Sequence, residues 1–200
     1  MSEVLLRAAG VGCEVDGMRL FHGLDLVVQG GEMVEVRGAN ASGKSTLLRC
    51  LAGLISPGSG AVEVRGDFAY VGHRLGLSDT LTARENLLWL LSLCASQLRR
   101  NELASRTDEA LVRLGISDTG GRTVASLSAG QRRRVALAGV LANPARLWLL
   151  DEPSTALDEV GVALLAAEMD RHLENGGGVV VATHRPLGPR PARTVQLGIT

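Results

Sequence analysis

The stretch GANASGKST at residues 38–46 constrains the fold of this chain more than any other feature of the sequence. It consists of a glycine, four residues and Gly-Lys-Ser, and it lies between a strand-like apolar run and the helix-like run KSTLLRCLAGL. Small residues let backbone N–H groups close around phosphates, and a helix start adds partial positive charge. A chance glycine turn that caps a helix is the alternative. We predict a phosphate-binding loop made of Gly38, Ala39, Asn40, Ala41, Ser42, Gly43, Lys44, Ser45 and Thr46.

Lys44 is the only lysine among the 21 basic residues, and the other twenty are arginine. A planar guanidinium differs from a compact ammonium in shape and hydrogen-bonding geometry, so a lone lysine indicates chemistry that arginine does not supply. In a phosphate loop the lysine reaches the β and γ phosphates, and the following hydroxyl, here Ser45, can hold Mg²⁺.

Strand-like and helix-like segments alternate along most of the chain. Apolar runs typical of strands occur near residues 4–8, 24–28, 61–64, 68–71, 147–151 and 178–183, with helical patterns between several of them. This alternation predicts an α/β fold with a largely parallel sheet. Residues 82–124 are nearly all helical in pattern, which predicts a helical subdomain inserted into an ATP-binding core of residues 1–81 and 125–200. We expect a single domain over residues 1–200.

The charge balance narrows the classes of partner. Twenty-one acidic side chains balance 21 basic ones, so no bulk charge favours nucleic acid. The longest apolar run, LLWLLSLCA at residues 87–95, is shorter than the roughly 18–20 residues that span a bilayer. The N-terminus has no basic region before its apolar patch, so no secretion signal is visible. We expect a cytoplasmic chain that does not cross a membrane and does not bind nucleic acid.

The run LWLLDEP at residues 147–153 ends an apolar strand in two carboxylates. A parallel sheet would bring Asp151 to the edge that carries the phosphate loop, where it could orient Mg²⁺. The next residue, Glu152, could accept the proton of an attacking water. A solvated acidic turn is the alternative.

The run LSAGQRRRVALAGVLANP at residues 127–144 predicts a helix with Ser128 as its N-cap and Asn143-Pro144 as its end. A helix start with serine and glycine can act as a second anion site. A capped, exposed helix start without a ligand is the alternative.

With these three motifs in this order, nearly the whole chain resembles the nucleotide-binding subunits of ATP-binding-cassette (ABC) proteins. The resemblance implies an α/β P-loop fold with a mainly parallel sheet, an N-terminal antiparallel portion and an inserted helical subdomain. It also implies an ATPase in which two subunits sandwich two ATP molecules with Mg²⁺. Ser128, Ala129, Gly130 and Gln131 of one subunit would then contact the γ phosphate that Lys44 of the other subunit holds.

The same resemblance assigns roles to two further segments. STALD at residues 154–158 would communicate across the dimer interface, with Asp158 among the residues that bind the nucleotide. His184, which directly follows an apolar strand, would be the catalytic switch at the γ phosphate; by itself it would be an ordinary loop histidine.

The sequence departs from the family pattern in the signature motif and in the loop that usually contacts adenine. The signature motif normally has two glycines, and Ala129 here adds a methyl group without removing a backbone donor, so we expect function to survive. The family usually stacks an aromatic side chain on adenine from a loop before the phosphate loop, and GCEVDGM at residues 12–18 contains none. We therefore expect looser selection of the base.

His73 in YVGHRLGL stands where the family usually carries a glutamine, between a strand and the helical subdomain. A neutral imidazole can accept a hydrogen bond from a metal-bound water or ligate the metal, and it titrates at about pH 6.5, unlike glutamine. A polar residue at a strand end is the alternative. We predict that His73 contacts Mg²⁺ and the nucleotide.

The run VGHRLGLSDTLTARENL is similar to the haem-exporter branch of the family, which serves cytochrome c maturation. LSAGQRRRVALA and THRPL agree with that branch, whereas residues 58–70 are shorter than its usual hairpin. The resemblance implies an integral membrane permease subunit as partner, which would meet residues 73–85 near Leu75, Leu77 and Leu81. It also implies a peripheral position on the cytoplasmic side of the inner membrane.

Two other functions stay open. The chain could be the ATPase subunit of another exporter or of a lipid-extraction complex. A soluble ABC protein that acts on nucleic acid fits less well, because the long coiled coils or tandem cassettes of such proteins do not fit in 200 residues. LSAGQ has no use in a P-loop kinase, which excludes that class most directly.

Overall fold

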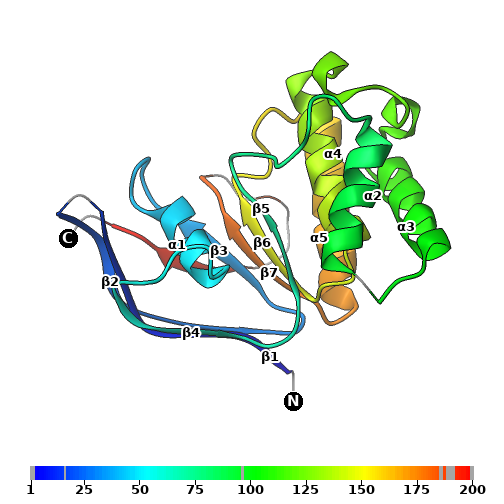
Figure 1. The fold of residues 1–200 in the computed structure, drawn as a ribbon. Coiled ribbons are helices and arrows are strands. Elements are labelled where there is room, and N and C mark those ends of the chain that lie inside the picture. Colours follow the sequence, from blue (N-terminus) through cyan, green and yellow to red (C-terminus); the bar gives the residue numbers. More distant parts are fainter. Residues whose placement is uncertain (1–2, 16, 96, 185–186, 188–191, 199–200) are drawn as a thin grey trace. The chain divides into compact units, whose positions relative to one another are not determined.

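The computed structural model describes residues 3–15, 17–95, 97–184, 187 and 192–198, and the chain divides into two compact units (Figure 1). The first unit is formed from residues 1–72, 145–152 and 169–200, and the second from residues 73–144 and 153–168. The predicted helical segment 82–124 lies wholly within the second unit. Residues 153–168 also belong to that unit, so two separate stretches of the chain form it.

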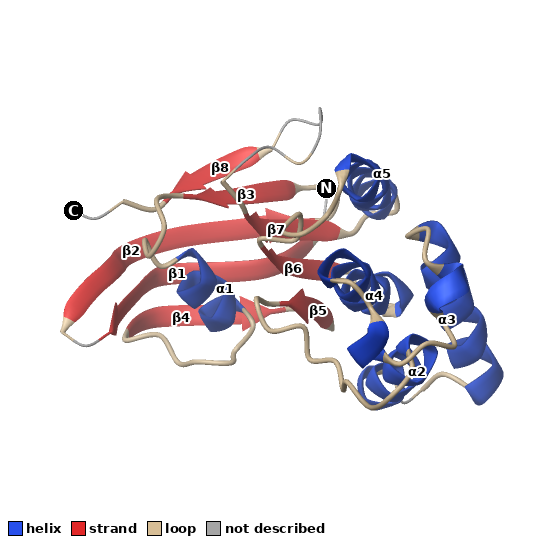
Figure 2. Cartoon of the chain, turned by 90° about the horizontal axis from the view of Figure 1, so that it is seen from above, coloured by secondary structure: helices blue, strands red, loops and turns tan. Residues whose placement is uncertain are grey.

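A parallel sheet in the first unit carries the nucleotide motifs at its strand ends. Its order is β5-β6-β7-β3-β8, and each pair of neighbours runs parallel (Figure 2). Central strands β6 and β7 are buried along their whole length, which is typical of parallel sheets. The α/β class predicted from the sequence is confirmed. The strands are β3 (Met33–Arg37), β5 (Phe68–Val71), β6 (Leu147–Asp151), β7 (Gly178–Ala182) and β8 (Arg193–Gln196).

An antiparallel sheet forms the N-terminal part of the first unit, as the resemblance implies. It contains β1 (Val4–Val15), β2 (Met18–Gln29) and β4 (Ser59–Val64) in the order β2-β1-β4. Helix α1 (Lys44–Leu51) packs between this sheet and the parallel sheet, and its leucines share one core with residues of both (Figure 1). This packing holds Lys44, the phosphate-loop residue that begins α1, at a fixed place.

Helices make up the second unit. They are α2 (Ala83–Cys94), α3 (Arg100–Arg113), α4 (Ala129–Ala142) and the first part of α5 (Glu159–Glu174), with short 3₁₀ turns at Ser117–Thr119 and Val124–Ser126. Helix α2 begins with a capping box, because Thr82 Oγ1 accepts from Glu85 N at 3.1 Å and the Glu85 carboxylate accepts from Thr82 N at 2.8 Å. Arg113 of α3 forms an ion pair with the buried Glu168 of α5.

A half-buried histidine stacks on a buried tryptophan in the first unit. The ring centroids of Trp148 and His172 lie 3.9 Å apart at an interplanar angle of 12°. His172 Nε2 lies 3.1 Å from the carbonyl oxygen of Arg146, which can only accept, so Nε2 carries the proton. Burial lowers the pKa of His172 below its usual value, because the charged ring would lose its hydration.

We expect the lowered pKa of His172 to make the fold less stable in mild acid. The unfolded chain binds the proton at about pH 6.5 and the folded chain only at lower pH, so this stability is present above that value and decreases as the pH falls. His172→Phe keeps an aromatic ring on Trp148 and cannot titrate. Thermal unfolding followed by circular dichroism between pH 7.5 and 5 should show a shallower fall of Tm in the variant, and equal slopes would contradict the assignment.

Candidate nucleotide-binding site

The predicted phosphate loop connects β3 to α1, and its glycines are required by close backbone packing. A Cβ on Gly38 would lie 2.5 Å from the carbonyl oxygen of Leu197. Gly43 has φ +93°, and a Cβ there would lie 3.0 Å from Leu20 Cβ. Ala41 adopts φ +64°, a left-handed conformation that costs energy for any residue with a Cβ. The loop therefore has a tight conformation that the surrounding core imposes.

Lys44 lies inside this loop rather than pointing into solvent. Its Nζ donates to the carbonyl oxygens of Gly38 at 2.9 Å and Ala39 at 3.0 Å, and the residue is 7% exposed. Ser42 Oγ is buried and has no hydrogen-bond partner among the described residues. A buried ammonium and an unsatisfied hydroxyl beside a helix start provide donors for a phosphate group. The geometry thus fits the predicted anion site.

Ser45 and Asp151 lie together, although 106 positions separate them in the chain. Ser45 Oγ donates to Asp151 Oδ1 at 3.0 Å, and Asp151 is buried at the end of β6. Among the described residues, no group of three or more His, Cys, Asp and Glu side chains could hold a metal. Mg²⁺ is usually bound through one or two protein oxygens together with phosphate oxygens and water. The two oxygen donors found here fit that mode of binding.

Glu152 and His184 also lie in contact within the first unit. His184 Nδ1 is 2.9 Å from Glu152 Oε2, and an ionised carboxylate only accepts, so Nδ1 carries the proton. Glu152 has φ +47°, and its backbone N–H donates to the carbonyl oxygen of Ala182 at 2.9 Å. This left-handed turn ends β6 and sets the direction of the carboxylate. The two side chains predicted to act at the γ phosphate are therefore neighbours.

The helix that starts at the LSAGQ motif lies in the second unit. Ser128 is the N-cap of α4, as predicted: its hydroxyl accepts from Gln131 N at 3.2 Å, and the Gln131 side chain accepts from Ser128 N at 3.0 Å. The Ala129 side chain is exposed. A Cβ on Gly130 would instead lie 2.7 Å from the carbonyl oxygen of Ala156. Alanine is thus accommodated at the first glycine position of the motif and not at the second.

His73 and Asp158 belong to the second unit, whereas Ser45 and Asp151 belong to the first. His73 directly follows the first unit and is exposed. The Asp158 carboxylate accepts from Gly161 N at 2.8 Å and pairs with Arg134. Contact of His73 with Mg²⁺ and contact of Asp158 with a nucleotide stay predictions.

Two buried contacts of arginine were not expected from the sequence. Arg133 is 5% exposed, and its Nε donates to the carbonyl oxygen of Pro153 at 3.1 Å. Arg134 pairs with Asp158 and its Nη1 lies 3.4 Å from the carbonyl oxygen of Leu114. The run of three arginines directly after LSAGQ was the only available signal, and a charge run usually indicates a solvated face.

The expected docking leucines are half-buried rather than exposed. Leu75, Leu77 and Leu81 each keep only part of their surface accessible. On the same unit, Trp89 and Leu93 of α2 are 53% and 62% exposed, and they lie one helical turn apart. The described helices include none with the length and apolar character needed to cross a bilayer.

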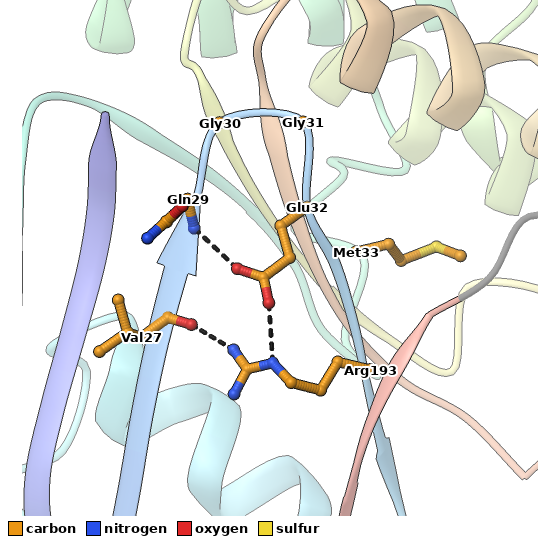
Figure 3. Close-up of a pocket in the computed structure, with 7 residues that line it drawn as sticks. All are labelled: Val27, Gln29, Gly30, Gly31, Glu32, Met33 and Arg193. Atoms are coloured by element: carbon orange, nitrogen blue, oxygen red, sulfur yellow. Dashed lines mark hydrogen bonds and ion pairs between the residues drawn. The ribbon is translucent and has the colours of Figure 1, made fainter. Parts of the chain in front are cut away.

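A cavity of about 540 Å³ lies away from the phosphate loop, at the turn between β2 and β3 (Figure 3). Glu32 closes this turn: its carboxylate accepts from Gln29 N at 2.9 Å and from Arg193 Nε at 2.7 Å. Arg193 also donates to the carbonyl oxygen of Val27. The charged side chains that line the cavity are therefore bonded to each other and to the backbone near the turn. These bonds attach β8 to the turn, so we assign the cavity a structural role.

Comparison with known proteins shows which proteins this chain is similar to. The sequence matches the ABC transporter family over residues 21–155, more than half of the chain. The cytochrome c biogenesis ATP-binding export protein CcmA of Pseudomonas putida (strain GB-1) is 42% identical over 207 residues, which cover 96% of both chains. The protein of the same name from Salmonella typhi is 41% identical over 204 residues, covering 96% of this chain and 95% of its own.

Solved structures agree with this match. The ATP-binding subunit of an ABC transporter superposes with a TM-score of 0.81 at 26% identity, covering 90% of this chain and 79% of that chain. A dimeric ATP-binding cassette in a post-hydrolysis state, bound to ADP and Pi, superposes with a TM-score of 0.83 at 25% identity. That superposition covers 96% of this chain and 94% of the other.

Proposed function

We propose that this chain, which belongs to the ABC transporter family, is the ATPase subunit of a haem-export complex in cytochrome c maturation. The main support for this proposal is the similarity of the chain, along almost its whole length, to export proteins of cytochrome c biogenesis from Pseudomonas and Salmonella. The Gly-His pair at Gly72 and His73 supports the same branch.

In this proposal the phosphates of ATP lie on residues 38–46. The Lys44 ammonium, which now bonds two loop carbonyl groups, would turn to the β and γ phosphates. Ser45 and Asp151 would hold Mg²⁺, and bound Mg²⁺ would withdraw charge from the phosphate oxygens. The loop itself would position the phosphates, because the tight turn at Gly43 already directs its backbone donors.

Glu152 would accept the proton of the attacking water in the same proposal. Its Oε2 already lies 2.9 Å from His184 Nδ1, so the histidine can orient the carboxylate before substrate binds. With the proton of a neutral His184 on Nδ1, contact of Nε2 with a γ-phosphate oxygen would require a second proton on the ring, because phosphate oxygens only accept. The two residues thus divide the work between proton acceptance and positioning.

Two copies of the chain would form the ATP-bound state. The exposed start of α4, with Ser128, Ala129, Gly130 and Gln131, would meet the γ phosphate on the partner's loop. ATP binding would close the dimer, and hydrolysis would reopen it. The ADP-bound dimer among the structural relatives supports this arrangement.

An integral membrane permease would be the other partner. We assign the permease contact to the second unit. To the predicted contact residues 73–85 we add Trp89 and Leu93, because they are the large apolar side chains left exposed on α2. The chain would then be peripheral, on the cytoplasmic side of the inner membrane.

His73→Gln should flatten any pH dependence of ATPase activity between about pH 6 and 7.5. Glutamine has no group that titrates in this range. Steady-state rates at saturating ATP across the range test the prediction, with His22→Gln as the control because His22 is an exposed histidine of β2. An unaltered profile in His73→Gln would exclude titration of His73 as the cause.

The proposed export function can be tested by complementation. A Pseudomonas putida strain that lacks its own cytochrome c biogenesis ATP-binding export protein should regain c-type cytochromes when it expresses this chain, measured by haem staining of membranes. The Lys44→Ala chain is the matched control and should not complement.

Affinity purification of the chain from solubilised membranes should recover a permease of the same complex. Recovery of a different exporter would instead support the alternative.

A further inference from the structure

The start of α4 is joined to the segment 153–158 by three contacts within the second unit. Arg133 Nε donates to the carbonyl oxygen of Pro153 at 3.1 Å, at one end of the segment. Arg134 forms an ion pair with Asp158 at the other end. Between them, Gly130 lies so near the carbonyl oxygen of Ala156 that a Cβ would approach it to 2.7 Å. The segment is thus fixed at both ends and in its middle.

Arg134 and Asp158 are both held by additional bonds. The Asp158 oxygen that meets Arg134 also accepts from Gly161 N at 2.8 Å, which is the geometry of an N-cap at the start of α5. That backbone N–H, and then the Arg134 guanidinium, lower the pKa of Asp158. Arg134 Nη1 lies 3.4 Å from the carbonyl oxygen of Leu114, and only 14% of its side chain is exposed. The pair therefore connects α4, α5 and the end of α3.

Ala156 shows that this segment needs external support. It has φ +66°, a left-handed conformation that is strained for a residue with a Cβ. Such a conformation persists where the surrounding contacts determine it. The anchors at Pro153 and Asp158 and the close contact with Gly130 provide those constraints. Without them, we expect residues 154–158 to relax to other turn conformations.

We propose that Arg134 is a positioning residue of the ATP-bound dimer, which keeps residues 154–158 in one fixed geometry with the Ser128 end of α4 by holding the Asp158 carboxylate. The inference rests on the proposed function, because only in a dimer would residues 154–158 and the Ser128 end of α4 both meet a second copy of the chain. Arg134 acts through Asp158. In the free chain it controls the conformation of the segment, and in the dimer it controls how the two segments meet the second copy together.

Two substitutions isolate the pair. Arg134→Gln removes the guanidinium, and Asp158→Asn keeps a capping oxygen for Gly161 N while removing the charge. Arg84→Gln is the matched control, because Arg84 makes a two-bond ion pair with Asp108 in the same unit, at 2.6 and 2.9 Å, away from α4. Amide hydrogen exchange of residues 155–161 in the free chain is the first measurement. Dimer formation with ATP in a Glu152→Gln background is the second.

We expect Arg134→Gln and Asp158→Asn each to speed exchange of residues 155–161 and to weaken dimer formation by roughly three- to tenfold, with the double variant no worse than either single one. Binding of ATP to the free Arg134→Gln chain should stay unchanged, since Arg134 belongs to the other unit from the phosphate loop. Arg134→Lys should rescue only part of the loss, because an ammonium lacks the fork that reaches Asp158 and Leu114 together.

The inference is overturned if Arg134→Gln behaves like Arg84→Gln in both measurements. It is also overturned if Asp158→Asn impairs the dimer while Arg134→Gln does not, since Asp158 would then act by itself. If the Glu152→Gln parent forms no ATP dimer, the dimer of the proposed function is wrong. The exchange measurement, which needs no dimer, then still decides whether Arg134 positions the segment.

Discussion

Glu152→Gln should bind ATP as the parent chain does, accumulate as an ATP-bound dimer, and turn over roughly 100-fold more slowly or worse. Glutamine has nearly the shape of glutamate and can still accept from His184 Nδ1, which lies 2.9 Å from the carboxylate. It cannot accept a proton from water, so the loss should appear in kcat and leave the affinity for ATP intact. Removal of a negative charge near the γ phosphate should also stabilise the ATP-bound state.

Single-turnover hydrolysis and size-exclusion chromatography with ATP measure the two effects of Glu152→Gln separately. Glu63→Gln is the control, because Glu63 is an exposed carboxylate of the same unit that pairs only with the neighbouring Arg65 among the described contacts. Unchanged turnover in Glu152→Gln would remove Glu152 as the general base and would leave the position of His184 unexplained.

Lys44→Ala should lose nucleotide affinity by roughly two orders of magnitude, because each charge-assisted hydrogen bond contributes about 1.5–3 kcal/mol. The ammonium is almost fully buried in the loop, so water cannot take its place easily. Arginine should not rescue, because its planar guanidinium is larger than the space that two carbonyl oxygens at 2.9 and 3.0 Å define. Equilibrium titration with a fluorescent ATP analogue measures the change.

The sequence offers a second test of the same residue. Lys44 is the only lysine, so an amine-directed reagent can modify only Lys44 and the N-terminal amine. ATP should protect Lys44 from modification and leave the N-terminal amine reactive, as peptide mass spectrometry can measure. Affinity in Lys44→Ala equal to that of the parent, or labelling of Lys44 that ATP does not slow, would contradict a phosphate contact.

Much of the nucleotide site could be predicted from short patterns. The run at residues 38–46 and the two carboxylates after LWLL each depend on local chemistry, and their placement at one sheet edge follows from parallel strands. The contact of Ser45 with Asp151 confirms that placement. Ser128 was predicted as an N-cap for the same reason, since capping depends on a few consecutive residues.

Other features could not be predicted in this way. Strands β1 and β2 are 12 residues long, whereas their apolar runs suggested about half that length. Glycines and charged residues interrupt the pattern of these strands, while the antiparallel ladder needs only backbone groups. Leu75, Leu77 and Leu81, near which the permease was expected to dock, are half-buried, and their burial depends on packing from distant segments.

The sequence by itself determined the family and the α/β class, because each depends on neighbouring residues with a fixed spacing, and it predicted which residues carry the phosphate chemistry. Only the tertiary structure decided how those residues are supported. It placed His184 in contact with Glu152, showed that a methyl group fits at residue 129 and not at residue 130, and joined Arg133 and Arg134 to residues 153–158. The physical reason is that these contacts join segments far apart in the chain, and no local pattern encodes a distance between them.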